Sequence, residues 1–150
     1  MIFGREKAVK EGLIETGRKL SALRLAVAHA GNLSAKVDEE NILITTTGAS
    51  LGNLASEEIL RVNLNSEQDT SNPRLTTEFP LHNLIYKNFP HKAIIHCHPT
   101  LINAYFAVNP TLKSLTFETK LYLGDLPVVE QDTPSITRLE PVREALKGNN

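Results

Sequence analysis

The hydrophobic residues in the first part of the chain follow two different periods. Between Arg5 and about Ala28 they recur at spacings of three and four, which predicts an amphipathic helix that Gly31 ends. Residues 32–37 and 41–46 are short segments separated by a polar turn. They are typical of two strands joined as a hairpin.

The rest of the chain alternates helical and extended patterns. Thr77 and Pro80 are typical of a helix start, and the apolar spacing continues to Phe89. The isoleucine-rich residues 92–98 predict a buried strand that ends on a histidine pair. The same criteria predict a strand at 59–64, a surface loop at 65–77, a helix from Pro99 to about Val108, a strand at 127–130 and a helix at 135–147. Alternating helices and strands predict a layered α/β domain.

Composition and charge narrow the classes of function. A chain of 150 residues with 41% hydrophobic content predicts a single domain with a core. Sixteen Lys and Arg against 17 Asp and Glu give a net charge of -1 without a basic block, so nucleic acid is not an expected partner. One cysteine, a charged start and no apolar run near the roughly 20 residues that span a bilayer predict a cytoplasmic protein without membrane contact.

His96 and His98 are candidate metal ligands. Residues i and i+2 of a strand point to the same face, so both imidazoles can converge on one ion, and neutral imidazole suits zinc. The alternative is a chance pair bonded to backbone or water. Cys97, between them, faces the other way and is expected to pack in the core.

Glu78 begins the helix that leads to the histidine strand. A carboxylate there can move a proton at a metal-bound substrate, or it can be an ordinary first-turn charge stabilised by the helix dipole. His82 lies one helical turn further on and can face the same cavity. It can be a ligand, an outer partner of the metal site or a core residue.

Three short segments carry hydroxyl groups and glycine backbone that can bind an anion. They are Gly31–Ser34, Thr45–Gly48 and the pair Thr76 and Thr77. Together with a helix N-terminus, such groups can bind a phosphate. Ordinary turn chemistry is the alternative for each of them.

Taken in order and with their spacing, these motifs resemble the class II aldolase/adducin family. The motifs are Gly31-Asn32-Leu33-Ser34, Ile44-Thr45-Thr46-Thr47-Gly48, Thr76-Thr77-Glu78, Leu81-His82 and Ile95-His96-Cys97-His98-Pro99. The resemblance covers about residue 7 to the chain end. It implies a three-layer α/β/α sandwich with a mixed, mostly antiparallel central sheet, and a homotetramer with active sites at subunit interfaces.

The resemblance also implies a role for each motif. It makes His96 and His98 zinc ligands and Glu78 the catalytic acid/base. It assigns the substrate phosphate to Asn32, Thr47, Gly48, Thr76 and Thr77. The implied activity is that of a zinc-dependent lyase, which reversibly cleaves a ketose 1-phosphate such as L-fuculose 1-phosphate to dihydroxyacetone phosphate and an aldehyde. The alternatives are an L-ribulose-5-phosphate 4-epimerase-like enzyme and a non-catalytic adducin-like interaction module.

Two departures from the family pattern affect these expectations. The family's third histidine ligand follows the helix that here is predicted to end at Lys147, while the sequence ends at Asn150. We therefore expect the C-terminal part of the domain to be missing and zinc to bind weakly or not at all. The position of the family's proton-donating tyrosine holds Phe117, with Tyr122 as a possible substitute. A metal-dependent hydrolase that adds Asp125 or Asp132 to the histidine pair is a further alternative.

Overall fold

The computed structural model describes residues 2–112, 116–124 and 126–147. It divides into two compact units, Met1–Thr100 and Leu101–Asn150, which we describe separately. The described elements are α1 (Ile2–Ala22), β1 (Asn32–Lys36), β2 (Asn41–Thr45), η1 (Leu51–Asn53), η2 (Ser56–Glu58), β3 (Ile59–Asn63), α2 (Glu67–Thr70), α3 (Phe79–Asn88), β4 (Ala93–His96), α4 (Thr100–Phe106), α5 (Phe117–Leu123) and α6 (Leu139–Lys147). Among them, no helix is both long enough and apolar enough to cross a membrane.

The first unit is built on a sheet whose described strands lie in the order β3-β2-β1-β4. Every pairing between these strands is antiparallel. The predicted hairpin is confirmed, with Ser34 on β1 opposite Ile44 on β2. On the other side of β1, Asn32 lies opposite His96 on β4, so the register brings two candidate site residues together.

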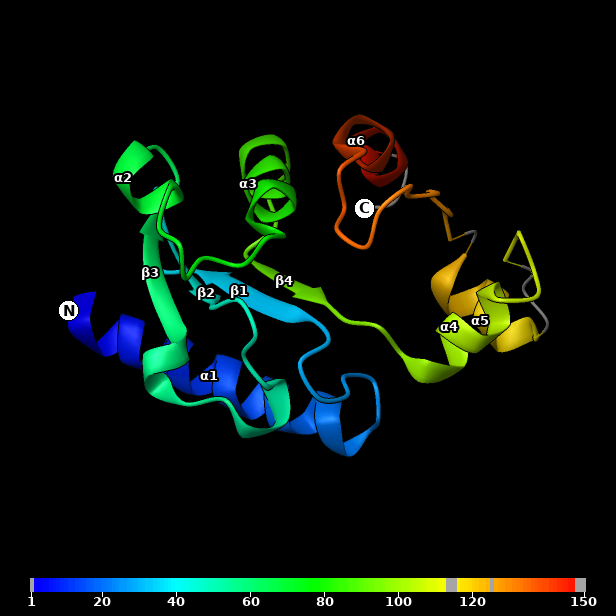
Figure 1. Ribbon diagram of the computed structural model, residues 1–150, viewed down its shortest axis with the longest axis horizontal. Helices are drawn as coiled ribbons and strands as arrows, with labels where there is room; N and C mark the ends of the chain where they lie inside the picture. Colours follow the sequence, from blue (N-terminus) through cyan, green and yellow to red (C-terminus); the bar gives the residue numbers. More distant parts are fainter. Residues whose placement is uncertain (1, 113–115, 125, 148–150) are drawn as a thin grey trace. The chain divides into compact units, whose positions relative to one another are not determined.

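Helices cover both faces of this sheet (Figure 1). Because side chains alternate along a strand, Leu43 packs on the side of α1, in a cluster with Leu13 and Leu20. Ile42 and Ile44 face the other way and pack with α3 in a second cluster, whose buried residues are Ile42, Ile44, Val62, Leu64, Leu75, Phe79 and Tyr86. The predicted α/β sandwich is therefore confirmed, with α1 and α3 as its outer layers.

The first helix ends earlier than the sequence predicts. We expected it to reach about Ala28, but α1 ends at Ala22. Arg24 adopts the left-handed conformation (φ 57°), and the N–H of Leu25 donates to the carbonyl of Leu20 at 2.8 Å. This is a Schellman-type end, in which apolar contact between Leu25 and the core outweighs the absence of glycine.

Among the described strands, the histidine strand lies at an edge of the sheet, and it is not the buried strand that we predicted. The side chain of Ile95 is 54% exposed, and β4 pairs only with β1 among the described strands. The run of isoleucines is equally compatible with a buried and with an edge strand, so the sequence does not distinguish them. His96 is the last residue of β4, and His98 lies beyond it.

Other predicted boundaries also move. The loop at 65–77 contains one helical turn, α2, which Ser66 caps by accepting from the N–H of Asp69. In the second unit, residues 127–130 are not a strand, because they pair with no other described strand. The last helix begins at Leu139 and not near residue 135. A hollow of about 950 Å³ in this unit contains none of the candidate site residues.

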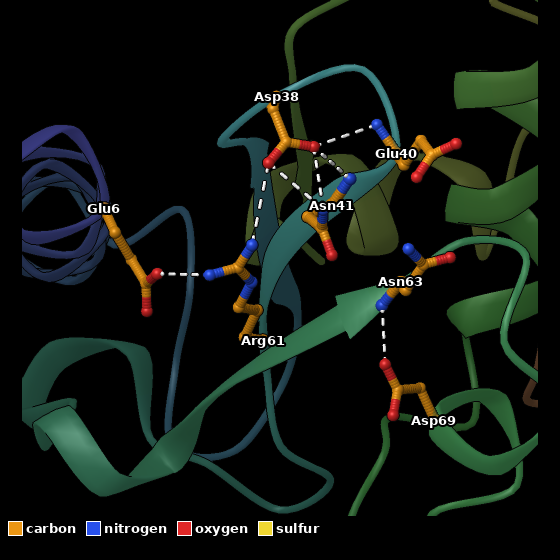
Figure 2. Close-up of polar contacts among 7 residues, drawn as sticks. All are labelled: Glu6, Asp38, Glu40, Asn41, Arg61, Asn63 and Asp69. Carbon is orange, nitrogen blue, oxygen red and sulfur yellow. Dashed lines mark hydrogen bonds and ion pairs between the residues drawn. The ribbon is translucent and has the colours of Figure 1, made fainter. Parts of the chain in front are cut away.

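Arg61 links the first helix to the hairpin turn (Figure 2). Its guanidinium lies 2.9 Å from a carboxylate oxygen of Glu6 on α1 and 3.6 Å from one of Asp38 in the turn. Asp38 also accepts from the backbone N–H groups of Glu40 and Asn41. The side-chain amide of Asn41 contributes most to holding the pKa of Asp38 below its usual value, and Arg61 adds to the effect. These contacts fix the β1–β2 turn against α1.

Gly17 permits close contact between α1 and η1. A Cβ at this position lies only 2.3 Å from the carbonyl oxygen of Leu51. We expect Gly17→Ala to lower the free energy of unfolding by about 1–3 kcal/mol, because the backbone must shift to relieve this overlap. Urea denaturation measures the change. Gly12→Ala is the matched control: it lies on the same helix with no atom within 4 Å of its Cβ, and should stabilise by about 0.5–1 kcal/mol. Equal effects of the two variants would contradict the packing argument.

Candidate active site

The two predicted metal ligands lie together where β4 ends. The ring centroids of His96 and His98 are 4.8 Å apart, and the ring planes meet at 53°. His96 is half-buried, while His98 is exposed. Burial lowers the pKa of His96, the proximity of His98 lowers it further, and Glu78 opposes both effects. His96 is therefore favoured in the neutral form, which is the form that binds a metal.

This pair fits part of a zinc site. Two imidazoles on one tetrahedral ion, with Zn–N bonds of about 2.0–2.1 Å, have ring centroids about 5 Å apart. The observed 4.8 Å matches that separation. Across residues 2–112, 116–124 and 126–147, no group of three or more His, Cys, Asp or Glu side chains is arranged to hold a metal. Among the described residues, His96 and His98 are thus two candidate ligands of a set that would need at least one more.

Glu78 is a buried residue that acts electrostatically on one member of this pair. Its side chain is 6% exposed, and its charge acts on His96. Glu78 occupies the N-cap position of α3, and its backbone N–H donates to Oγ1 of Thr76 at 3.3 Å. The helix begins at Phe79 with Pro80 in its first turn, as the sequence predicts. A buried carboxylate next to a neutral imidazole is suited to accept or return a proton.

His82 lies in a hydrogen-bonded chain of buried side chains. Its Nε2 is 2.5 Å from Oδ1 of Asn32, and its Nδ1 is 2.6 Å from Oγ of Ser34. Ser34 Oγ is in turn 2.8 Å from the hydroxyl of Tyr86. At the other end, Nδ2 of Asn32 is 3.3 Å from Nδ1 of His96. This series of hydrogen bonds therefore connects α3 to His96, one of the candidate metal ligands.

Sequence reasoning only partly found this network. It left open whether His82 is a ligand, an outer partner or a core residue; the structure makes it a buried residue bonded to Asn32 and Ser34. Tyr86 was not among the candidate residues. The signal was present, because Tyr86 lies at i+4 from His82 and Ser34 at i+2 from Asn32, which places each pair on one face of its element.

Two of the three predicted phosphate segments lie on neighbouring stretches of backbone. Thr46 pairs with Leu75 as an isolated bridge, and the N–H of Thr47 donates to the carbonyl of Arg74 at 2.9 Å. The segment with Thr47 and Gly48 therefore lies beside the strand-like stretch that leads into Thr76 and Thr77. Thr76 is buried, whereas Thr47, Gly48 and Thr77 are exposed. In addition, Nδ1 of His29 donates to the carbonyl of Gly48 at 2.7 Å.

Gly31 allows β1 to approach the histidine strand. Its φ is +107°, and a Cβ on this residue lies 2.5 Å from the carbonyl oxygen of His96. Only glycine meets both conditions without strain. The close approach of β1 to β4 that places Asn32 opposite His96 therefore requires glycine at position 31.

Cys97 and the remaining candidates each have their own surroundings within their unit. Cys97 packs against the core cluster on the α1 side, as predicted, and burial raises its pKa. Phe117 and Tyr122 belong to α5 in the second unit, with side chains 74% and 78% exposed. Asp132 forms an ion pair with Arg138 at 3.9 Å, and Asp125 lies outside the described residues.

Comparison with known families decides the broad assignment. Residues 11–150 match the family described as Class II Aldolase and Adducin N-terminal domain. The chain belongs to this family. The predicted family resemblance is confirmed, and the α/β sandwich is consistent with the fold of class II aldolases.

The curated relatives of this chain, all similar to a member of the class II aldolase family, are named for different reactions. This chain is 31% identical over 140 residues to 3-oxo-tetronate 4-phosphate decarboxylase of Pectobacterium atrosepticum, covering 89% of this chain and 64% of that protein. It is 29% identical over 132 residues to methylthioribulose-1-phosphate dehydratase of Citrobacter koseri, covering 87% of this chain and 61% of that protein. The chain thus spans less than two thirds of the length of these two relatives.

A solved class II aldolase has the same fold. The crystal structure of L-fuculose-1-phosphate aldolase from Thermus thermophilus aligns with a TM-score of 0.79 and 27% sequence identity. The alignment covers 94% of this chain and 71% of that structure. Membership of the family therefore rests on both sequence and fold, while the individual reaction differs among the relatives.

Proposed function

We propose that this chain forms the N-terminal part of a zinc-dependent lyase that acts on a small phosphorylated sugar. Its reaction is reversible cleavage of a ketose 1-phosphate such as L-fuculose 1-phosphate, which yields dihydroxyacetone phosphate and an aldehyde. The observation that carries the proposal is the pair of close imidazoles at the end of β4, with a buried carboxylate acting on one of them. The fold likeness to a fuculose-phosphate aldolase supports the choice of substrate class.

In this proposal His96 and His98 hold the metal, and Glu78 moves the proton. A divalent cation held by these two residues would supply polarisation of a carbonyl or adjacent hydroxyl oxygen of the substrate. Glu78 removes the proton from the hydroxyl of the carbon that becomes the aldehyde. The bond between the two fragments breaks, its electron pair stays with the carbonyl-bearing fragment, and that fragment takes up one proton to become dihydroxyacetone phosphate. Burial limits the access of water to the Glu78 side chain, which suits a group that exchanges a proton with the substrate.

The substrate phosphate is assigned to backbone and hydroxyl groups close to Glu78. The proposed binding residues are Asn32, Thr47, Gly48, Thr76 and Thr77. The backbone contact between Thr47 and Arg74 supports this assignment, since it brings the two segments side by side. The start of α3 adds the positive end of the helix dipole.

Decarboxylation of a phosphorylated keto acid is the second candidate reaction. The relative from Pectobacterium atrosepticum, which is named a 3-oxo-tetronate 4-phosphate decarboxylase, favours it. Both reactions break a bond to the carbon next to a carbonyl, and both leave an electron pair on that carbon that a cation held by His96 and His98 would help to stabilise. They differ in the fragment released, which is an aldehyde in one case and carbon dioxide in the other.

The metal assignment predicts selective loss of zinc binding. We expect His96→Gln and His98→Gln each to weaken zinc binding by more than about 100-fold, because direct ligands matter more than outer partners, whose loss costs about 10–100-fold. Competition with a chromophoric chelator measures the affinity. His91→Gln is the control, since that ring stacks on Phe89 at 5.8 Å and is not part of the pair. Equal zinc affinity in all four proteins would overturn the assignment.

A substrate panel separates the two reactions. The zinc-loaded chain is incubated with L-fuculose 1-phosphate, L-ribulose 5-phosphate, 3-oxo-tetronate 4-phosphate and methylthioribulose 1-phosphate. Formation of an aldehyde from L-fuculose 1-phosphate supports the aldolase, and release of carbon dioxide from 3-oxo-tetronate 4-phosphate supports the decarboxylase. If zinc binds but none of the four is converted, we would abandon the catalytic proposal for this chain in favour of a non-catalytic, adducin-like module.

A further inference from the structure

The buried network of Tyr86, Ser34, His82 and Asn32 ends on a candidate metal ligand. All four residues are buried, and His82 has no exposed surface. Asn32 and Ser34 project from the same face of β1, while His82 and Tyr86 project from the same side of α3. The bonds form one unbranched chain from the Tyr86 hydroxyl to Nδ1 of His96.

In this series of hydrogen bonds, each group that donates at one end accepts at the other, so all the bonds must point in one direction. With Asn32 Oδ1 toward His82, that oxygen can only accept, so His82 Nε2 donates to it. Neutral His82 then has no hydrogen on Nδ1, which accepts from Ser34. At the other end, Asn32 Nδ2 donates to His96 Nδ1, so the hydrogen of neutral His96 lies on Nε2. A nitrogen that carries a hydrogen cannot bind a metal.

Rotating the Asn32 amide by half a turn reverses the whole chain. The amide oxygen and nitrogen then exchange places without moving any other heavy atom. In this arrangement His96 Nδ1 donates to Asn32, Asn32 donates to His82 Nε2, and His82 Nδ1 donates to Ser34. His96 Nε2 is left with a free electron pair. Donation from the second ring nitrogen to a fixed acceptor is the usual arrangement around metal-binding histidines.

Burial of His82 restricts the network to two arrangements of its hydrogen atoms. It lowers the pKa of His82 to about 3, with the nearby His96 adding to the effect, so His82 carries a single ring hydrogen at neutral pH. A single hydrogen can lie on Nε2 or on Nδ1, and each position matches one direction of the chain. The Ser34 hydroxyl can rotate to serve either direction.

We propose that this network sets which nitrogen of His96 carries the hydrogen, and that Asn32, His82, Ser34 and Tyr86 are positioning residues for the metal site. This inference rests on the proposed metal site at His96 and His98. When His96 binds a cation through Nε2, Asn32 Oδ1 accepts from His96 Nδ1 and every bond behind it reverses. One N–H of Asn32 remains available to a substrate phosphate, because its amide has two hydrogens.

The hydrogen position on His82 tests the proposal directly. Long-range nitrogen–proton NMR spectra of the full chain, with and without zinc, identify which ring nitrogen of each histidine carries hydrogen. We expect His82 to change from Nε2–H to Nδ1–H on zinc binding, although it does not touch the metal. A change at His96 without one at His82 overturns this inference alone. Absence of change at both His96 and His98 overturns the metal site, and this inference with it.

A pair of hydroxyl deletions tests the energetic link. Ser34→Ala breaks the chain, and Thr45→Val removes a buried hydroxyl that accepts from the backbone N–H of Leu33 at 3.1 Å, outside the chain. Both should lower stability, but only Ser34→Ala should weaken zinc binding, by about 10–100-fold. The chelator competition assay measures this difference. Equal zinc affinities of the two variants would refute the link.

Discussion

Replacing Glu78 by Gln is expected to lower turnover by about 10²–10⁴-fold, on whichever substrate of the panel is converted. This is the usual contribution of a positioned acid or base. Gln has almost the same shape as Glu, so packing at this buried position is preserved while the proton acceptor is lost. The rate at saturating substrate measures the effect, and circular dichroism verifies the fold.

Glu57→Gln is the matched control for this variant. Glu57 lies in η2 with an exposed side chain, outside the candidate site. We expect its turnover to equal that of the wild type. If Glu78→Gln retained more than about half of the wild-type rate, where the acid/base role predicts at least a 100-fold loss, Glu78 would be a structural charge at the start of α3.

Acid is expected to destabilise the protein through His82. The pKa of this residue is about 3 in the folded protein, mainly because of burial, against about 6.5 in the unfolded chain. Below pH 6.5 the unfolded chain therefore takes up a proton that the folded protein does not bind. Each pH unit between 6.5 and about 3 lowers the free energy of unfolding by about 1.4 kcal/mol, and His82 has no effect above that range.

A non-titrating variant isolates this contribution from those of other groups. We measure urea denaturation of the wild type and of His82→Gln at pH 7.5, 6.5, 5.5 and 4.5. The stability advantage of the wild type should be constant between pH 7.5 and 6.5, then shrink by about 1.4 kcal/mol per unit. Lost hydrogen bonds lower the stability of the variant equally at all pH values. A difference that stays constant down to pH 4.5 would show that His82 is not held neutral.

The sequence was most informative where local patterns and long-range packing agree. The hairpin of β1 and β2 was predicted because polar residues separate two apolar strands, and the start of α3 because Pro80 suits a first helical turn. The end of α1 was not predicted correctly, because Arg24 takes the left-handed conformation that glycine usually adopts at a helix end. Nothing in the local composition indicates that Arg24 adopts the left-handed conformation and ends the helix.

For the candidate site, spacing identified the histidine pair but not its surroundings. His96 and His98 are two residues apart, so one element brings them together. The bond between Ser34 and His82 joins residues 48 positions apart, and it depends on how α3 packs on the sheet. Such contacts depend on the tertiary arrangement, which a single sequence does not reveal.

The pairing of β4 with β1 makes the candidate chemistry sensitive to slippage. Neighbouring residues of a strand point to opposite faces, so a shift of β4 by one position would turn His96 toward α1 and put Cys97 in its place. As β4 pairs with β1 alone among the described strands, one set of backbone bonds holds it in place. We therefore expect insertions near Lys92 to abolish the proposed metal binding in a protein whose core remains folded.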